Sequence, residues 1–166
     1  MHYVYPYEVE KDGDTLVVAF PDIPGALTQV DPGEDFDAVV RDCLVAALGG
    51  YAELRQRPPR PSAPRGRSTI ALDVLLSAKL ALVTAMIEAG VTNVELARKL
   101  RLSEKVARRL RDLDHTSRID RLEAALACLG QQLELSVRAI PSATSPPPQS
   151  NSPSARPARK ERVFLR

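Results

Sequence analysis

The sequence predicts an α+β protein in which a small β-β-β-α-β domain precedes an all-α domain that ends in a trailing strand. Short runs rich in β-branched and aromatic residues dominate residues 1–30, whereas apolar residues recur at helical spacing from Val74 onward. The net charge is −7 over residues 1–57 and +9 over residues 58–166. The chain therefore joins an acidic front half to a basic back half, and such an asymmetry favours nucleic acid as a partner of the basic half.

Three strands are expected near the start of the chain. Residues 3–9 and 15–20 form an antiparallel pair in this prediction, because the loop between them contains Asp-Gly, a hairpin signal. Residues 26–30 then return as a third strand after a Pro-flanked turn. Pro6 has no N–H to donate, so its strand is expected at a sheet edge, or with that position turned outward.

A helix, a connector and a fourth strand follow. Acidic residues within 34–37 favour a helix start, and an apolar stripe continues to Leu48. Residues 58–67 are rich in Pro and Arg and predict a stiff, exposed connector. A short strand within residues 68–73 is expected to join residues 1–57 in the first domain.

Residues 74–140 are expected to form the second domain, which contains the candidate for DNA binding and dimerisation. Its first helix ends at Gly90, a typical C-cap residue. Its last helix occupies about residues 118–129, with Thr116 or Ser117 as the N-cap. Two short helices lie between them.

The end of the chain has two different patterns. Residues 133–140 alternate between apolar and polar as far as Ala139, which predicts a half-buried strand. Such a strand in a helical domain offers an edge for pairing between two copies, so we expect a homodimer or a higher oligomer. Residues 141–166 are rich in Ser and Pro and are expected to be a disordered tail.

Residues 92–110 predict a helix-turn-helix, within a helical region of about residues 76–127. Thr92 and Glu95 have the spacing of a capping box, and Ser103 is placed to cap the second helix. The short side chain of Ala97 allows the two helices to cross closely. The shared core is expected to consist of Leu96, Leu100, Leu102, Val106 and Leu110.

The polar residues left over from this core are candidate DNA contacts. On the second helix they are Ser103, Glu104, Lys105, Arg108 and Arg109. Arg108 and Arg109 are expected to read base edges in the major groove of double-stranded operator DNA, because a guanidinium matches guanine O6 and N7. Arg98 and Lys99 on the preceding helix are expected to neutralise phosphates. Residues 92–121 carry a net charge of +4, which agrees with a polyanionic partner.

The turn of this motif departs from the usual pattern. Arg101 occupies a position where helix-turn-helix motifs commonly carry Gly, because the backbone there adopts a positive φ. An arginine tolerates that conformation at modest strain.

Two segments resemble one known family. The first is Phe20-Pro21-Asp22-Ile23-Pro24-Gly25-Ala26-Leu27-Thr28-Gln29 followed by an acidic helix start, and the second includes Ala97-Arg98-Lys99-Leu100, Arg109-Leu110 and residues 115–126. In this order and spacing they resemble a HicB-type antitoxin of a type II toxin–antitoxin system with a C-terminal Xre-like helix-turn-helix. The resemblance implies a degenerate RNase H-like N-terminal domain that neutralises a HicA-type mRNA-cleaving toxin, and a C-terminal domain that represses the operon. The residues that contact the toxin are not indicated.

Two alternatives remain open at this point. One is a stand-alone repressor whose N-terminal domain senses a ligand or partner. The other is a metal-dependent nuclease, because active RNase H-like enzymes hold carboxylates around two metal ions. Here Glu10, Asp12 and Asp14 fall in the predicted hairpin and Asp22 in a turn, so we interpret them as a solvated acidic surface. We expect no catalytic residue, metal site or cofactor, and an acidic surface suits a basic, RNA-binding toxin.

The expected location is the cytoplasm. The start of the chain has no basic region followed by an apolar stretch, and no window reaches the length of a membrane span. Cys43 and Cys128 have no CxxC partner, so neither a disulfide framework nor a zinc site is indicated.

Overall fold

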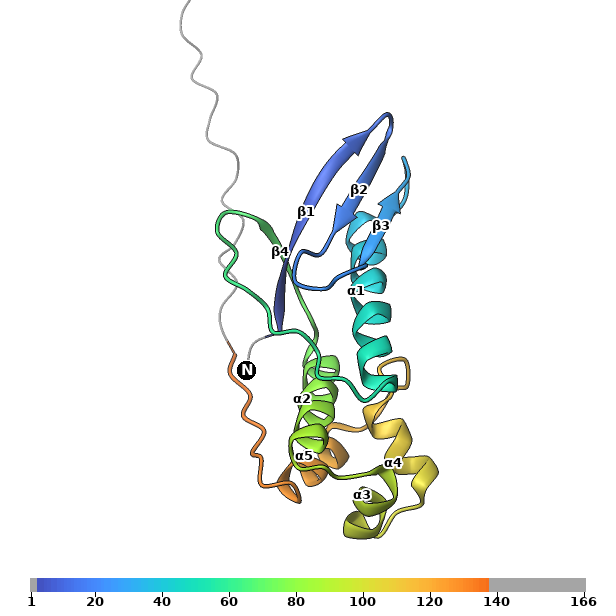
Figure 1. The fold of residues 1–166 in the computed structure, drawn as a ribbon, viewed down its shortest axis with the longest axis vertical. Coiled ribbons are helices and arrows are strands. Elements are labelled where there is room, and N and C mark those ends of the chain that lie inside the picture. The colour runs from blue at the N-terminus through green and yellow to red at the C-terminus, as the bar shows by residue number, and fades with distance from the viewer. Residues whose placement is uncertain (1–2, 138–166) are drawn as a thin grey trace, which may run out of the picture. The chain divides into compact units, whose positions relative to one another are not determined.

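A computed structural model describes residues 3–137 of the chain (Figure 1). The elements are β1 (Val4–Asp12), β2 (Thr15–Ala19), β3 (Leu27–Val30), α1 (Phe36–Glu53), β4 (Ser68–Ala71), α2 (Val74–Glu88), α3 (Asn93–Leu100), α4 (Glu104–Arg111) and α5 (Ile119–Ala127). This order confirms the predicted α+β class, with a sheet and its helix first and further helices afterwards. Within the described residues, 3–134 form one compact unit, and residues 135–137 are not part of it.

The four strands form one antiparallel sheet in the order β3-β2-β1-β4. β1 is shared between two ladders: Val4–Tyr7 pair with β4, and Glu8–Asp12 pair with β2. β1 as a whole is therefore not an edge strand, but its half that contains Pro6, Val4–Tyr7, pairs on one side only, as the predicted edge position requires. Pro6 stands opposite Thr69 of β4, in the half of β1 that β2 does not pair, so its missing N–H has only one ladder to disturb.

One face of the sheet packs against α1. Asp35 caps this helix, because its carboxylate accepts the backbone N–H of Ala38 at 3.2 Å. The buried side of α1 repeats every four residues and meets aromatic and β-branched residues of the sheet. This first core includes Tyr5, Val18, Phe20, Val40, Leu44 and Leu48.

The connector between α1 and β4 is fastened to the sheet. The Tyr5 hydroxyl donates to the carbonyl oxygen of Pro59 at 2.8 Å, and the backbone N–H of Ser62 donates to the Asp22 carboxylate at 2.8 Å. Pro58 is buried, although most other connector residues are exposed as expected. The prolines thus stiffen a segment that is also tied down at two points.

α2 contributes to two cores. Leu80 packs with the sheet and α1, whereas Leu82 and Met86 pack with α3, α4 and α5. A helix that is apolar on every side is a buried helix, and eight residues of α2 are buried. The division of the chain at residue 74 stays a prediction, because one helix serves both cores.

The end of the described chain differs from the prediction. Cys128 follows the last residue of α5, and residues 133–137 have no strand. A strand requires a hydrogen-bonding partner, and the described part of this single chain does not supply one there. Residues 138–140 of the expected strand and the expected tail, residues 141–166, lie outside the described residues.

Residues 3–137 contain no single helix that is long and apolar enough to cross a membrane. Val74–Glu88 and Asn93–Leu100 reach that length and apolarity only as a pair, with a bend of 108° between them. In the same part of the chain, no group of three or more His, Cys, Asp or Glu side chains is placed to hold a metal ion.

Candidate nucleic-acid interface

α3 begins with a complete capping box. The Thr92 hydroxyl oxygen accepts the backbone N–H of Glu95 at 3.2 Å, and the Glu95 carboxylate accepts the Thr92 N–H at 2.7 Å. These hydrogen bonds from Thr92 lower the pKa of Glu95, because they favour the charged carboxylate. The predicted capping box is confirmed, and it fixes the direction in which α3 leaves α2.

Three residues, Arg101 to Ser103, join α3 to α4. Arg101 has φ 55° and ψ 40°, the left-handed conformation that the sequence predicted for a non-glycine residue. The chain reverses there, and the Leu102 N–H donates to the Ala97 carbonyl at 2.9 Å. The Ser103 hydroxyl oxygen then accepts the Val106 N–H at 3.4 Å, which confirms its role as the N-cap of α4.

The two helices share a small core. Leu96, Ala97 and Leu110 are buried, as predicted, and Ala107 is fully buried as well. Ala107 was not anticipated, although its position three residues before Leu110 is the helical spacing of a core residue. Two alanines in this core allow the helices to approach closely, and the polar residues of α4 therefore remain on its outer side.

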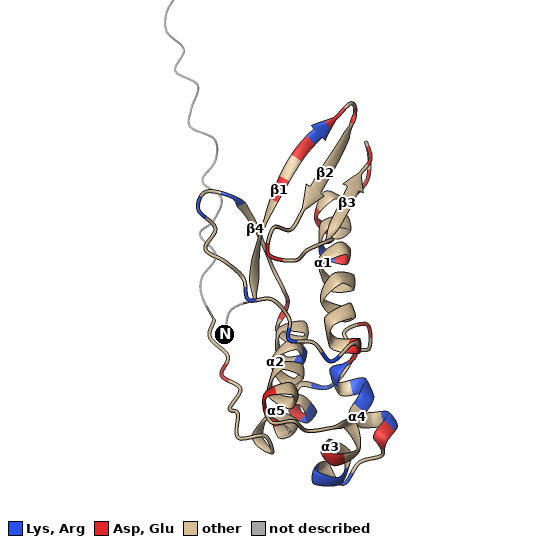
Figure 2. Ribbon diagram, viewed as in Figure 1, with Lys and Arg blue, Asp and Glu red and all other residues tan. Residues whose placement is uncertain are grey.

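The predicted contact residues are all exposed. They are Arg98 and Lys99 on α3, Ser103 in the turn, and Glu104, Lys105, Arg108 and Arg109 on α4. Figure 2 shows basic residues gathered on α3 and α4. This gives a rigid helix pair an exposed, positively charged face.

Arg108 already has a partner on its own helix. Its guanidinium lies 3.2 Å from the Glu104 carboxylate, and the two side chains are 65% and 49% exposed. An exposed pair of this kind contributes only a few tenths of a kcal/mol, about 0.3–0.5 kcal/mol, so an incoming phosphate or base edge can displace it. The pair with Glu104 therefore orients Arg108 only weakly and leaves it free to contact DNA.

Lys79 fixes the C-terminal end of α4, and sequence reasoning missed it. This fully buried residue of α2 donates to the carbonyl oxygen of Arg109 at 3.3 Å and also to the carbonyl oxygens of Asp112 and His115. Burial lowers the pKa of Lys79, and the nearby carboxylates of Asp112 and Asp114 offset part of that effect. The available signal was a lysine in the middle of an otherwise apolar helix.

A hydrogen bond at the same end of α4 contradicts a predicted cap of α5. The Ser117 hydroxyl donates to the Arg109 carbonyl at 3.2 Å, and α5 begins after Arg118 without a side-chain cap. The expectation that Thr116 or Ser117 caps α5 is therefore wrong. The orphan carbonyls at the end of α4 compete successfully for this hydroxyl.

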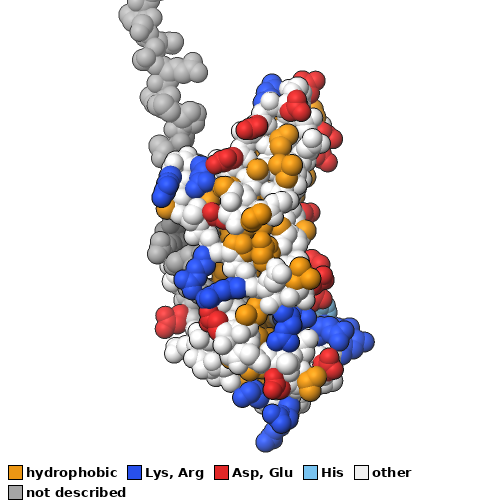
Figure 3. Space-filling view, in the orientation of Figure 1, with side chains coloured by type: hydrophobic (Ala, Val, Ile, Leu, Met, Phe, Trp, Pro, Cys, Tyr) orange, Lys and Arg blue, Asp and Glu red, His pale blue; other side chains and the backbone are white. Residues whose placement is uncertain are grey.

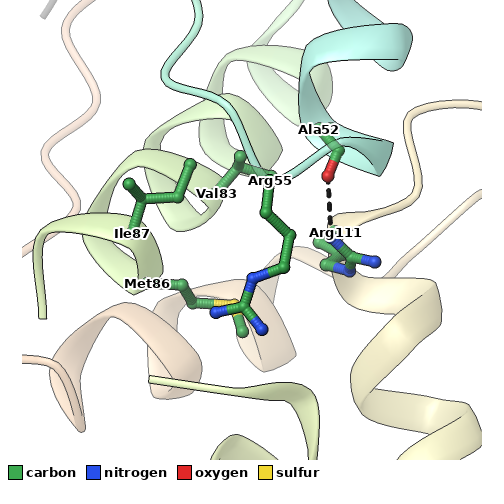
Figure 4. A pocket seen from close by; sticks show the side chains of 6 residues that line it. All are labelled: Ala52, Arg55, Val83, Met86, Ile87 and Arg111. Carbon is green, nitrogen blue, oxygen red and sulfur yellow. Dashed lines mark hydrogen bonds between the residues drawn. The ribbon is translucent and has the colours of Figure 1, made fainter. Parts of the chain in front are cut away.

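Arg111 reaches from the end of α4 to Ala52 near the end of α1 (Figure 4). Its Nη1 donates to the Ala52 carbonyl oxygen at 2.7 Å, and the side chain lines a small cavity with Val83 and Met86. Burial lowers the pKa of Arg111, and the neighbouring positive charges of Arg55 and Arg108 lower it further. Arg111 therefore anchors α4 to the end of α1.

Comparisons with known sequences agree on one family. The model of a family described as HicB_like antitoxin of bacterial toxin-antitoxin system matches residues 2–81. "Antitoxin HicB 2" of Photorhabdus laumondii subsp. laumondii is 37% identical over 131 residues, which are 79% of this chain and 94% of that protein. "Antitoxin HicB" of Escherichia coli K12 is 33% identical over 121 residues, 72% of this chain and 87% of that protein. "Antitoxin HicB" of Pseudomonas fluorescens is 31% identical over 139 residues, 82% and 95% respectively.

The chain belongs to the HicB-like antitoxin family of bacterial toxin–antitoxin systems. Members of this family are antitoxins, a non-enzymatic class that acts on a toxin partner. The family model ends at residue 81, before α3. The match to the Photorhabdus protein covers 79% of a chain of 166 residues and therefore necessarily includes α3 and α4.

Proposed function

We propose that this antitoxin neutralises a HicA-type, mRNA-cleaving toxin in the cytoplasm and represses its own operon through a helix-turn-helix formed by α3 and α4. One observation supports the proposed repression through DNA binding. Every polar residue that the sequence assigned to DNA is exposed on a helix pair whose ends are fixed by Thr92, Ser103 and Lys79. A rigid helix with basic residues on its outer face matches the requirements of the major groove.

Different residues serve different parts of the DNA in this proposal. Arg108 and Arg109 enter the groove and read guanine edges, and Ser103, Glu104 and Lys105 lie beside them at the start of α4. Arg98 and Lys99, in the last turn of α3, neutralise phosphates. Phosphate contacts position the helix, whereas base contacts give it specificity.

We further propose that two copies bind a two-fold operator. A single α4 reads only one half-site, and helix-turn-helix repressors commonly pair to match operator symmetry. Light scattering at micromolar concentration tests this step, and a monomeric mass would contradict it.

The two activities are tested separately with the full-length chain. For repression, fluorescence anisotropy compares a duplex from upstream of the operon with a scrambled duplex of equal length. Tighter binding to the upstream duplex supports the proposal, and equal binding contradicts operator recognition. For neutralisation, the toxin encoded in the adjacent reading frame is assayed for mRNA cleavage. Cleavage that continues at an equimolar amount of this chain contradicts the antitoxin–HicA pairing.

A further inference from the structure

The sheet has an open edge beside a groove. β3 is a terminal strand of the sheet, with β2 as its only partner among the described residues. A groove of about 540 Å³ lies between β3 and α1. Leu27 and Thr28 line it on one side, and Val39, Cys43 and Ala46 line it on the other. An exposed row of backbone groups thus runs beside a shallow apolar hollow.

This edge lacks the usual protection against pairing. Natural edge strands are commonly blocked by charged residues or Pro, but Leu27–Val30 contains neither. Leu27 is a large apolar side chain that is 61% exposed. On the helix side, burial raises the pKa of the Cys43 thiol, which keeps it neutral. The surface therefore has the composition of a docking site for an added strand.

The negative charge around the groove favours a basic partner. Residues 27–50 contain five acidic residues, of which Asp42 lines the groove, and one basic residue, Arg41. Arg41 turns to the opposite edge of the sheet, where it donates to the Ala71 carbonyl in β4 at 3.3 Å. Figure 3 shows acidic side chains along the side of the sheet where β3 and α1 lie. A second copy would bring like charges together here, whereas a basic partner is attracted.

We infer that the toxin adds a strand to β3. Its basic side chains face the five acidic residues within 27–50, here called the acidic rim, and its small apolar side chains enter the groove beside Ala46. This inference rests on the proposed neutralisation of a toxin and specifies where it occurs. A toxin that binds and cleaves mRNA has to present basic residues to a polyanion. When the acidic rim covers those basic residues, the antitoxin holds the toxin and also prevents the toxin from binding RNA.

The test uses two groove variants of the full-length chain and two matched controls. Asp42→Lys reverses the charge in the groove, and Glu123→Lys makes the same reversal at an exposed position of α5, outside the sheet. Ala46→Trp fills the groove, and Ala127→Trp makes the same change at an exposed position of α5. Circular dichroism and operator binding show that each variant is folded.

Calorimetric titration with the toxin from the adjacent reading frame gives the main result. Each groove variant is expected to raise the Kd at least about tenfold, and each control less than about threefold. Hydrogen exchange of the Leu27–Val30 amides is expected to slow in the toxin complex. Groove variants that bind the toxin like the unmodified chain would overturn the inference and leave neutralisation intact.

Two further outcomes are distinguishable. If the unmodified chain does not bind the toxin, the proposed neutralisation itself is refuted, together with this site. If the groove variants reduce the mass of the antitoxin alone in light scattering, the groove holds a second copy, and the assignment to the toxin is wrong.

Discussion

The ammonium of Lys79 on α2 lies 3.3 Å from the carbonyl oxygen of Arg109, a residue that we propose to read DNA. The same ammonium donates to the carbonyls of Asp112 and His115, and the side chain is fully buried. The last carbonyls of a helix have no partner within the helix and carry partial negative charge. A buried cation at this point therefore holds the end of α4 in a fixed position against α2.

Lys79→Met tests this relationship. Methionine keeps the apolar stem but leaves three carbonyl oxygens without this donor, while it also removes the desolvation cost of a buried charge. We expect a net loss of about 2 kcal/mol in the free energy of unfolding, measured by urea denaturation. Lys11→Met, at an exposed position of β1, is the control and should change stability by less than about 0.5 kcal/mol. Unchanged stability in Lys79→Met would show that the desolvation cost balances the hydrogen bonds.

Arg101→Gly tests the strain in the turn between α3 and α4. Arg101 has φ 55°, where a side chain costs about 1–2 kcal/mol and glycine costs none. Glycine also gives the unfolded chain more freedom, which offsets about 0.4–1 kcal/mol of the gain. The expected result is a stabilisation of about 0.5 kcal/mol by urea denaturation. Arg98→Gly, inside α3, should instead destabilise the chain by about 1 kcal/mol, and a loss in both variants would contradict strain at Arg101.

Local patterns predicted most of the elements, because their causes lie within a few residues. The Asp-Gly hairpin, the capping box of Thr92 and Glu95, and the cap at Ser103 all depend on neighbours three to five positions away. The exposed residues of α4 followed from the same reasoning, because burying one side of a short helix leaves the other side outside.

Relationships across long stretches of sequence were not predictable. Lys79 donates to the carbonyl oxygen of Arg109, 30 residues further along the chain. No local pattern indicates that a lysine in an apolar helix will cap another helix. From the sequence, Arg111 is similarly one of several basic residues near the end of α4. Only the structure shows that it donates to the Ala52 carbonyl at the end of α1. The central position of β1 also depends on β4, which joins the sheet only after α1 and the connector.

Glu95 gives α3 a defined dependence on acid. Hydrogen bonds from Thr92 lower the pKa of this carboxyl below its ordinary value of 4.5 in the folded chain. The stabilisation is therefore fully present above about pH 4.5 and is lost as the pH falls through the lowered pKa. Glu95→Gln removes this titration, so the difference in unfolding free energy between it and the unmodified chain should shrink in acid.

Thr92→Ala is the matched partner in this experiment. Because Thr92 and Glu95 bond to each other, the double variant should lose less than the sum of the two single losses at neutral pH. Urea denaturation at several pH values between neutral and acid measures both effects. A constant difference between Glu95→Gln and the unmodified chain at every pH would exclude the carboxylate as the cause.

The division of labour between α4 and α3 predicts two different responses to DNA. Arg108→Ala and Arg109→Ala should each weaken operator binding by about 1–3 kcal/mol with little loss on scrambled DNA, because base contacts carry sequence preference. Arg98→Ala and Lys99→Ala should weaken both duplexes equally and reduce the slope of log K against log salt by about 1 each. Fluorescence anisotropy at several salt concentrations separates the two responses, with Lys11→Ala on β1 as the control. Equal losses on both duplexes for Arg108→Ala would place its guanidinium on a phosphate. The ion pair with Glu104 would then compete with a DNA phosphate and not with a base edge.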